Sequence, residues 1–282
     1  MSTTTTSPGS HAGFLTPRQR TLALLGFARN ALREGLAYRA DLVMSMISQV
    51  VQVVLLMVVW RSVYGSATTV SGISREQAVS YAVLASSMQT VMMPWAFSGL
   101  YERVRTGQVG VDMTRPVGLV PQLLAQNLGT MLARLPVAAT GVVAALVIGA
   151  IRVPPAPWSL GLWAVSAVLG LALGMVLNLL MSMISFWSLE ITGWMMIYRF
   201  GSAVLSGSLI PLWFMPGWLR SILEWLPFQG QMFTPLVIFF GRTSWPNALE
   251  LMGVQVAWIA GCSALLWLVW RAAQTKVVVQ GG

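Results

Sequence analysis

The most regular feature of the chain is a series of long apolar stretches that alternate with short charged segments. A helix that spans a membrane needs about 20 mainly apolar residues. Stretches of this kind, one of them interrupted only by Arg199, predict six membrane-spanning helices. Their ranges are 42–60, 78–100, 135–151 (extended backwards by 128–133), 160–186, 191–211 and 251–270.

The segment between the fifth and sixth predicted spans is apolar but broken. It contains four prolines, a Gln-Gly-Gln sequence, Arg220 and Glu224. Because a broken backbone exposed to lipid is not tolerated, we predict two short re-entrant or interfacial helices that are packed on protein. Four tryptophans are expected at headgroup depth, namely Trp213, Trp218, Trp225 and Trp245.

The first 40 residues divide into two parts. Residues 1–16 are polar and rich in Ser and Thr, which predicts a disordered tail. Residues 17–40 carry leucines at three- and four-residue spacing, including Leu22 and Leu25, with Arg29 and Arg33 on another face. This pattern is typical of an amphipathic helix on the inner leaflet, although the segment could also be a mere retention signal. Residues 41–282 then form the transmembrane domain.

Composition identifies the bilayer as the main solvent of the chain. Apolar residues make up 56% and charged residues 9%, whereas a soluble domain carries roughly 25% charged residues. Basic residues are roughly twice as frequent beside the N-terminus, the second loop and the C-terminus as on the other side, which places both termini in the cytoplasm. The arginines lie between apolar runs rather than on a soluble face, so the net charge of +9 does not indicate a nucleic-acid partner.

The chain offers few residues for catalysis. His11 is the only histidine and Cys262 the only cysteine, which argues against a histidine base, a multi-histidine metal site and an intrachain disulfide. The serines of Ser206-Gly207-Ser208 have no base to take a proton, and no P-loop sequence for phosphate binding occurs. We therefore expect no enzyme activity and no cofactor or metal bound by this chain.

The second loop, YERVRTGQVGVDMTRPVGLVPQ (101–122), is short and charged, and its glycines and prolines favour turns. Such a loop suits docking to a soluble partner, but it equally suits a solvated connector. Its stretch GQVGVDMTRP (107–116), together with FWSLEITGW, LSGSLIPLWFMPGWLRSILEWLPF, LAYRADLVMSMI and the closing VVVQGG, resembles permeases of the ABC type-2 exporter family. The resemblance covers residues 20–282, and these permeases are the membrane subunits of bacterial ATP-binding-cassette transporters.

The resemblance implies an assembly in the bacterial inner membrane. Two permeases, a second copy of this chain or a homologous one, would form a pathway, and two separate ATP-binding subunits would bind ATP and magnesium. The helix at 17–40 would be the family's elbow helix. The loop from Glu102 to Pro116 would be the coupling helix, with the turn 188–193 as a second contact. The coupling candidates are Glu102, Arg103, Arg105, Asp112, Arg115, Pro116 and Glu190.

The resemblance also implies a cavity between subunits, on the first, second and fifth spans. The candidate lining residues there are Gln49, Gln52, Met57, Gln89, Met92 and Arg199. Asn178 is expected to pack inside the subunit, and Arg199 either reaches the inner headgroups or places a cation at the cytoplasmic mouth. A cavity rich in methionine suits an amphipathic or hydrophobic cargo such as a drug-like compound, a lipid or a peptide.

Two other functions remain open from the sequence. An ion-gradient-driven secondary transporter usually shows internal repeats and a buried acidic residue for ion coupling, and neither is evident. A non-transporting membrane anchor or regulatory subunit would leave the coupling-like loop unexplained. The favoured prediction is therefore an all-α permease subunit of an ATP-driven exporter.

Overall fold

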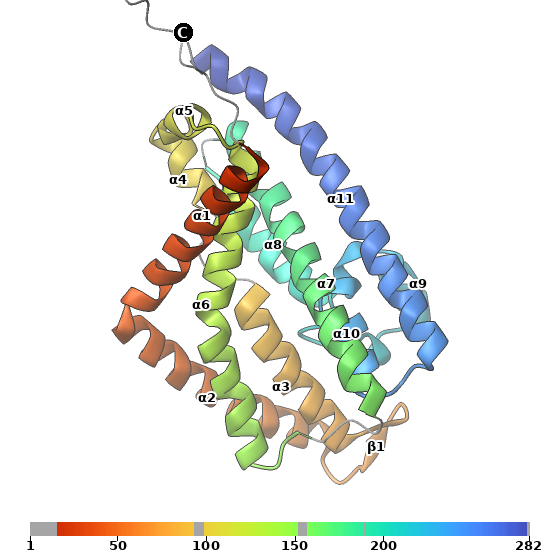
Figure 1. Ribbon diagram of the computed structural model, residues 1–282. Coiled ribbons are helices and arrows are strands. Elements are labelled where there is room, and N and C mark those ends of the chain that lie inside the picture. Colours follow the sequence, from red (N-terminus) through yellow and green to blue (C-terminus); the bar gives the residue numbers. More distant parts are fainter. Residues whose placement is uncertain (1–15, 93–98, 152–156, 189, 281–282) are drawn as a thin grey trace, which may run out of the picture.

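The computed structural model describes residues 16–92, 99–151, 157–188 and 190–280 and is built almost entirely from helices (Figure 1). The predicted disordered tail, apart from Thr16, lies outside these residues. The chain begins with α1 (Pro17–Ala37), α2 (Arg39–Tyr64), a hairpin of β1 (Thr69–Val70) and β2 (Ile73–Ser74), and α3 (Arg75–Met92). It continues with α4 (Leu100–Arg105), α5 (Gln108–Met113), α6 (Leu119–Val147), α7 (Pro157–Ser182) and the 3-10 turn η1 (Met183–Phe186). The last elements are α8 (Thr192–Leu205), η2 (Leu212–Phe214), α9 (Gly217–Leu223), η3 (Pro227–Gln231), α10 (Phe233–Phe239) and α11 (Trp245–Gln280).

Four of the six predicted spans are helices long and apolar enough to cross a membrane. They are α2, α6, the continuous helix Pro157–Phe186 and the Trp245–Lys276 part of α11. The second predicted span corresponds to α3, which is described only as far as Met92 and is largely buried among other helices. The fifth corresponds to α8, whose 14 residues reach about 21 Å at 1.5 Å per residue, short of the roughly 30 Å hydrocarbon core. Neither α3 nor α8 is confirmed as a span.

The predicted end of the fifth span at Pro211 was wrong, because the helix ends at Leu205. Gly207 has a φ of +77°, in the left-handed region that glycine adopts without strain. A Cβ on Gly207 would lie 2.5 Å from Leu212 Cδ1. The Tyr81 hydroxyl donates a hydrogen bond to the Gly207 carbonyl oxygen at 2.9 Å. The turn after α8 is therefore tied to α3.

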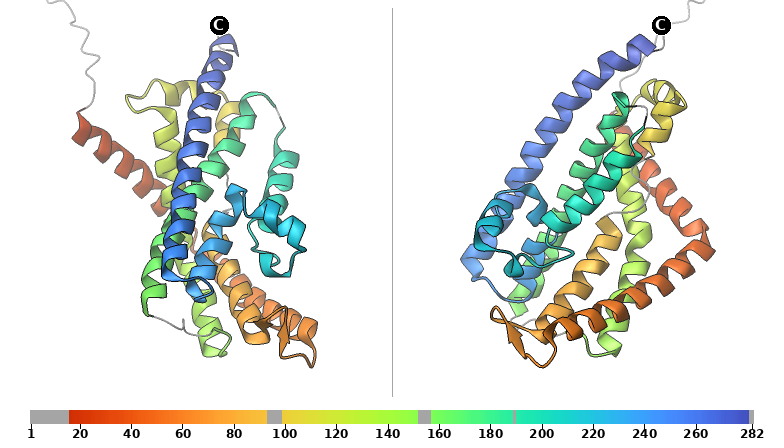
Figure 2. Two further views of the ribbon diagram at one scale, coloured as in Figure 1. Left: turned by 90° about the vertical axis from the view of Figure 1, so that its right-hand side faces the viewer. Right: turned by 180° about the vertical axis from the view of Figure 1, so that it is seen from behind.

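The helices pack in two groups. In the first helix group, α1, α2 and α3 pack against α6, and in the second, α8, α10, α11 and η3 pack against α7 (Figures 1 and 2). Within the second group, the Gln255 amide nitrogen of α11 donates to the carbonyl oxygens of Ser166 at 3.0 Å and Gly230 at 2.7 Å. A Cβ on Gly170 of α7 would lie 2.7 Å from the Gln231 carbonyl oxygen. The close approach at Gly170 and the hydrogen bonds of Gln255 thus hold η3 against α7 and α11.

The predicted amphipathic segment is the helix α1, which crosses α6 obliquely (Figure 1). Its contact with α6 uses small residues, since a Cβ on Gly129 would overlap the carbonyl oxygen of Ala28. Leu22 and Leu25 lie on its outer side and are 59% and 60% exposed. The exposed leucines agree with an amphipathic helix, and its place on the inner leaflet stays a prediction.

The prediction of two short helices between the fifth and sixth spans is confirmed by α9 and α10. Every residue of α10 is buried, so α10 packs on protein as expected, whereas most residues of α9 are exposed. Trp218 and Trp225 are exposed, whereas Trp213 packs between Tyr81 and Phe233, with ring centroids 5.1 Å and 5.3 Å away. The expectation that Trp213 faces headgroups does not fit this aromatic cluster.

Candidate functional site

The second loop folds into a compact element, α4–α5, at one end of the bundle (Figure 1). The start of α1 and the end of α11 lie towards the same end, and the hairpin lies at the opposite one. Leu100 and Val109 of α4–α5 are buried in one apolar cluster with Met183 of η1 and Leu266 of α11. The element is therefore docked on the helical bundle rather than being a solvated connector.

Asp112 is the electrostatic centre of α4–α5. Its side chain is 1% exposed and forms ion pairs with Arg103 at 2.9 Å and Arg115 at 3.2 Å. The Arg103 guanidinium also donates to Gln126 Oε1 of α6 at 3.0 Å, and Gln122 of α6 donates to the Asp112 carbonyl oxygen at 3.2 Å. Asp112 thus braces the element from inside, and its predicted contact with a partner subunit stays a prediction.

The other coupling candidates lie on the surface. Glu102 and Arg105 form an exposed ion pair at 3.1 Å, and Pro116 is also exposed. Glu190, on the turn before α8, accepts a hydrogen bond from the Thr192 backbone nitrogen at 2.8 Å. The hydrogen bonds with Thr192, and then the charge of Arg105, lower the pKa of Glu190. The structure therefore brings the loop and the turn close enough to interact. We call Glu102, Arg105 and Glu190 the charged rim.

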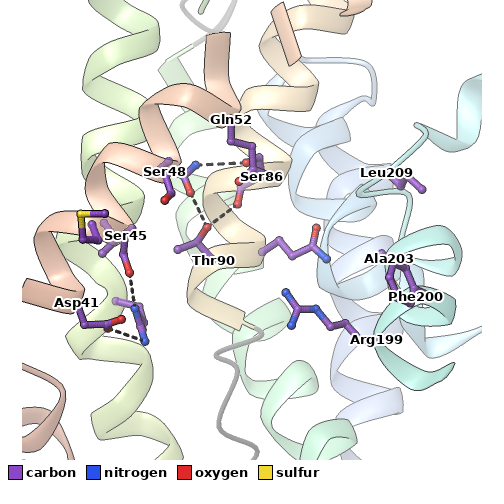
Figure 3. Close-up of a pocket in the computed structure, with 15 residues that line it drawn as sticks. Asp41, Ser45, Ser48, Gln52, Ser86, Thr90, Arg199, Phe200, Ala203 and Leu209 are labelled. Atoms are coloured by element: carbon purple, nitrogen blue, oxygen red, sulfur yellow. Dashed lines mark hydrogen bonds and ion pairs between the residues drawn. The ribbon is translucent and has the colours of Figure 1, made fainter. Parts of the chain in front are cut away.

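Four of the six lining candidates meet in one groove of about 550 Å³ between α2, α3, α6 and α8 (Figure 3). These are Gln49, Gln52, Gln89 and Arg199. The other two lie elsewhere. Met57 is buried in the core between α2, α3 and α6, and Met92 is fully buried next to α7, where its carbonyl oxygen accepts a hydrogen bond from Asn178 at 2.9 Å. Met57 and Met92 are therefore not part of this groove, whereas Asn178 packs inside the subunit as expected.

The floor of the groove is a hydrogen-bonded network. The Gln49 amide donates to Ser86 Oγ at 3.3 Å and accepts from Thr90 Oγ1 at 2.8 Å. Near one end, Arg134 of α6 donates to Ser45 Oγ at 3.1 Å and pairs with Asp41 at 3.4 Å. Gln49 is only 3% exposed, so its amide is held in one orientation at the back of the groove.

Sequence reasoning missed the pairing of Asp41 with Arg134. Asp41 lies at the start of the first predicted span, and Arg134 lies at the foot of the third. Opposite charges at the same end of two helices were the available signal, because charges at a membrane edge are commonly paired. Ser45, Ser86 and Thr90 gave no comparable signal, since single hydroxyl residues are common in spanning helices.

The long apolar helices are those of a membrane protein. A family model described as an ABC-2 family transporter protein matches residues 47–281. The chain therefore belongs to the ABC-2 family of transporter membrane components. It is a multi-pass membrane protein and the non-catalytic subunit of a transporter that associates with an ATP-binding subunit. No curated protein and no solved structure gives a significant match to the chain.

Proposed function

We propose that the chain is the permease subunit of an ATP-driven exporter in the bacterial inner membrane and forms half of a dimeric pathway. Family membership supports the transporter role. The observation that carries the ATP-driven mechanism is the α4–α5 element, in which buried Asp112 is paired with two arginines. A surface element braced in this way can transmit a displacement to the helices that it contacts instead of absorbing it.

The charged rim is the proposed contact with two ATP-binding subunits, which carry ATP and magnesium. Glu102 and Arg105 have exposed side chains, and Glu190 lies near them on a second segment. Exposed charges of both signs give orientation and register to a docking partner more than they give affinity. Closure of the ATP-binding subunits would push on α4–α5 and change the packing of the bundle.

The proposed partner in the membrane is a second copy of this chain or a homologous permease. The groove is open along one side and is bordered by apolar residues, namely Met44 of α2, Phe200 of α8 and Leu209 after the end of α8. These three side chains are 63%, 67% and 58% exposed. Opposed grooves of two permeases would enclose a pathway with a polar floor and apolar edges, which suits an amphipathic cargo better than a wholly hydrophobic one.

A charge exchange on the rim tests the proposal. The double variant Glu102→Arg/Arg105→Glu keeps an ion pair within α4 but reverses the pattern presented to a partner. Arg220 of α9 and Glu224 at its C-terminal end are a similar exposed pair at 2.6 Å and provide the control, Arg220→Glu/Glu224→Arg. Each chain is tagged, purified in mild detergent and assayed for a copurifying cassette ATPase and for ATP hydrolysis.

We expect the wild type and the α9 control to retain the ATPase, and the rim variant to lose it with an unchanged elution profile. A wild-type chain that purifies with no ATPase would refute the proposal and favour a gradient-driven transporter or an anchoring subunit. An ATPase retained equally by both exchanges would refute the role of the rim. Mass spectrometry of the same sample shows whether a second permease is present.

A further inference from the structure

The bundle contains a second groove, which is bordered by α1, α4–α5 and α6 and has a volume of about 740 Å³. We call it the α1 groove, and we call the groove of about 550 Å³ between α2, α3, α6 and α8 the α8 groove. The lining of the α1 groove is mostly polar and includes the amides of Asn30, Gln108, Gln126 and Asn127. Because α4–α5 forms one of its walls, the α1 groove lies towards the end of the bundle that carries α4–α5 (Figure 1).

The two grooves meet at one ion pair. Among the residues that the structure describes, Asp41 and Arg134 alone line both grooves. Their side chains are 3.4 Å apart, and Arg134 also donates a hydrogen bond to Ser45 Oγ at 3.1 Å. Figure 3 shows Asp41, Ser45 and Ser48 following one another along α2 in the α8 groove. A molecule that moves from one groove to the other therefore passes the side chains of Asp41 and Arg134.

The Asp41–Arg134 pair differs from the ion pairs of Asp112 in its exposure to water. The side chains of Asp41 and Arg134 are 61% and 27% exposed, whereas that of Asp112 is 1% exposed. Ion pairs that water can reach contribute little to stability, because water solvates both charges once the pair opens. Rotation of two partly exposed side chains also leaves the packing of α2 against α6 unchanged. The Asp41–Arg134 pair is thus suited to opening and closing, while Asp112 is suited to bracing.

We propose that the Asp41–Arg134 pair is a gate through which the polar head group of an amphiphilic cargo passes from the α1 groove into the α8 groove. This inference rests on the proposed function and names the entry route to its pathway. A charged or strongly polar head group can replace the partner that each side chain loses when the pair opens, so no charge is left unpaired near lipid. Beyond the gate, Ser45, Ser48 and Gln52 offer hydrogen bonds, while the apolar chain of the cargo stays at the open side of the α8 groove. A wholly apolar molecule has no group that replaces the pair, so the gate excludes it.

The test measures how fast a water-soluble thiol reagent reaches each side of the gate. A Ser48→Cys reporter lies in the α8 groove, about 10 Å beyond Asp41 along α2 at 1.5 Å per residue. An Asn30→Cys reporter lies in the α1 groove. Each full chain is labelled in phosphatidylcholine nanodiscs with an anionic and, separately, a cationic methanethiosulfonate. Mass spectrometry of the peptides gives the labelling rate at the reporter and at buried Cys262, which is the control for unfolding.

A gate that is open about a tenth of the time slows access to the α8 groove about tenfold. We therefore expect Asp41→Ala and Arg134→Ala each to raise the labelling rate of the Ser48→Cys reporter about tenfold with both reagents. The Asn30→Cys reporter, which lies before the gate, should react at the same rate in every variant. The exchange Asp41→Arg/Arg134→Asp restores an ion pair and should restore slow labelling.

Equal labelling of the Ser48→Cys reporter with the pair intact and with the pair removed would overturn the proposal. Opposite effects on the two reagents would also overturn it, because they would reflect charge alone. A parallel rise at Cys262 would do the same, because it would identify the pair as a brace of the fold. Labelling needs no ATPase, so a gated reporter in a chain that purifies alone would support this inference while refuting the proposed ATP-driven function. An ungated reporter beside a copurifying ATPase would refute this inference alone.

Discussion

Replacing Asp112 with alanine is expected to destabilise the α4–α5 element and the core beneath it. The substitution removes two charge-assisted contacts, at 2.9 Å to Arg103 and 3.2 Å to Arg115. Breaking a buried ion pair costs about 3–5 kcal/mol. The two arginine side chains are 24% and 41% exposed, so both can be partly rehydrated. We therefore expect a loss of about 2–3 kcal/mol in the free energy of unfolding.

The single cysteine of the chain provides the assay. Cys262 is 6% exposed and belongs to the same apolar cluster as Leu100 and Val109, so a thiol-reactive fluorescent maleimide labels it only when that cluster opens. Labelling during a temperature ramp in detergent should show a Tm about 5 °C lower for Asp112→Ala. Glu102→Ala breaks only an exposed ion pair and should have the same Tm as the wild type, because exposed ion pairs contribute little to stability. If Asp112→Ala also melts with the wild type, the buried ion pairs do not hold the element together.

Three further predictions concern other contacts. Gly129→Ala should lower Tm by forcing α1 away from α6. Gly26→Ala should not lower Tm, because its Cβ would meet nothing within 4 Å. Equal Tm values for the two variants would show that the α1–α6 contact is not close. Gln255→Leu should speed proteolysis between α8 and α11, because Gly230 of η3 loses its hydrogen bond to α11. Unchanged cleavage would contradict that role. The pKa of Glu190 is lowered in the folded state, owing first to its hydrogen bonds with Thr192. The contribution of Glu190 to stability is therefore present above its ordinary pKa of about 4.5 and is lost as the pH falls through the lowered pKa. The Tm values of the wild type and Glu190→Gln should therefore differ at neutral pH and converge in acid.

The helical fold was predictable from the sequence because burial in a bilayer requires long uncharged stretches. The helices α2, α6, α7 and α11 follow this rule, and each appeared as an apolar run. The helix α3 also lies in an uncharged stretch, but protein rather than lipid covers most of its surface, and it carries polar residues such as Ser86 and Thr90. Apolar composition also placed the end of α8 too late, because Leu209 and Ile210 continue the run beyond the turn at Gly207.

The candidate site was only partly predictable. Polar residues on spanning helices pointed to Gln49, Gln52 and Gln89, since a polar side chain in lipid needs a partner or a cavity. Methionine gives no such signal because it suits a core and a cavity equally, and Met57 and Met92 are both buried. The loop pattern likewise identified Asp112 as important without showing whether it points inward. That distinction depends on Gln122 and Gln126, which approach the loop from another helix.

The α4–α5 element contacts both helix groups at once. Arg103 is bonded to Gln126 of α6, in the first group, while Leu100 and Val109 share a core cluster with residues of α7 and α11, in the second. The groove opens between the same two groups, with α2 and α3 on one side and α8 on the other. We propose that the two helix groups move as rigid bodies that are joined by α4–α5. A displacement of α4–α5 would then rotate one group against the other and change the width of the groove, while the interior packing of each group stays the same.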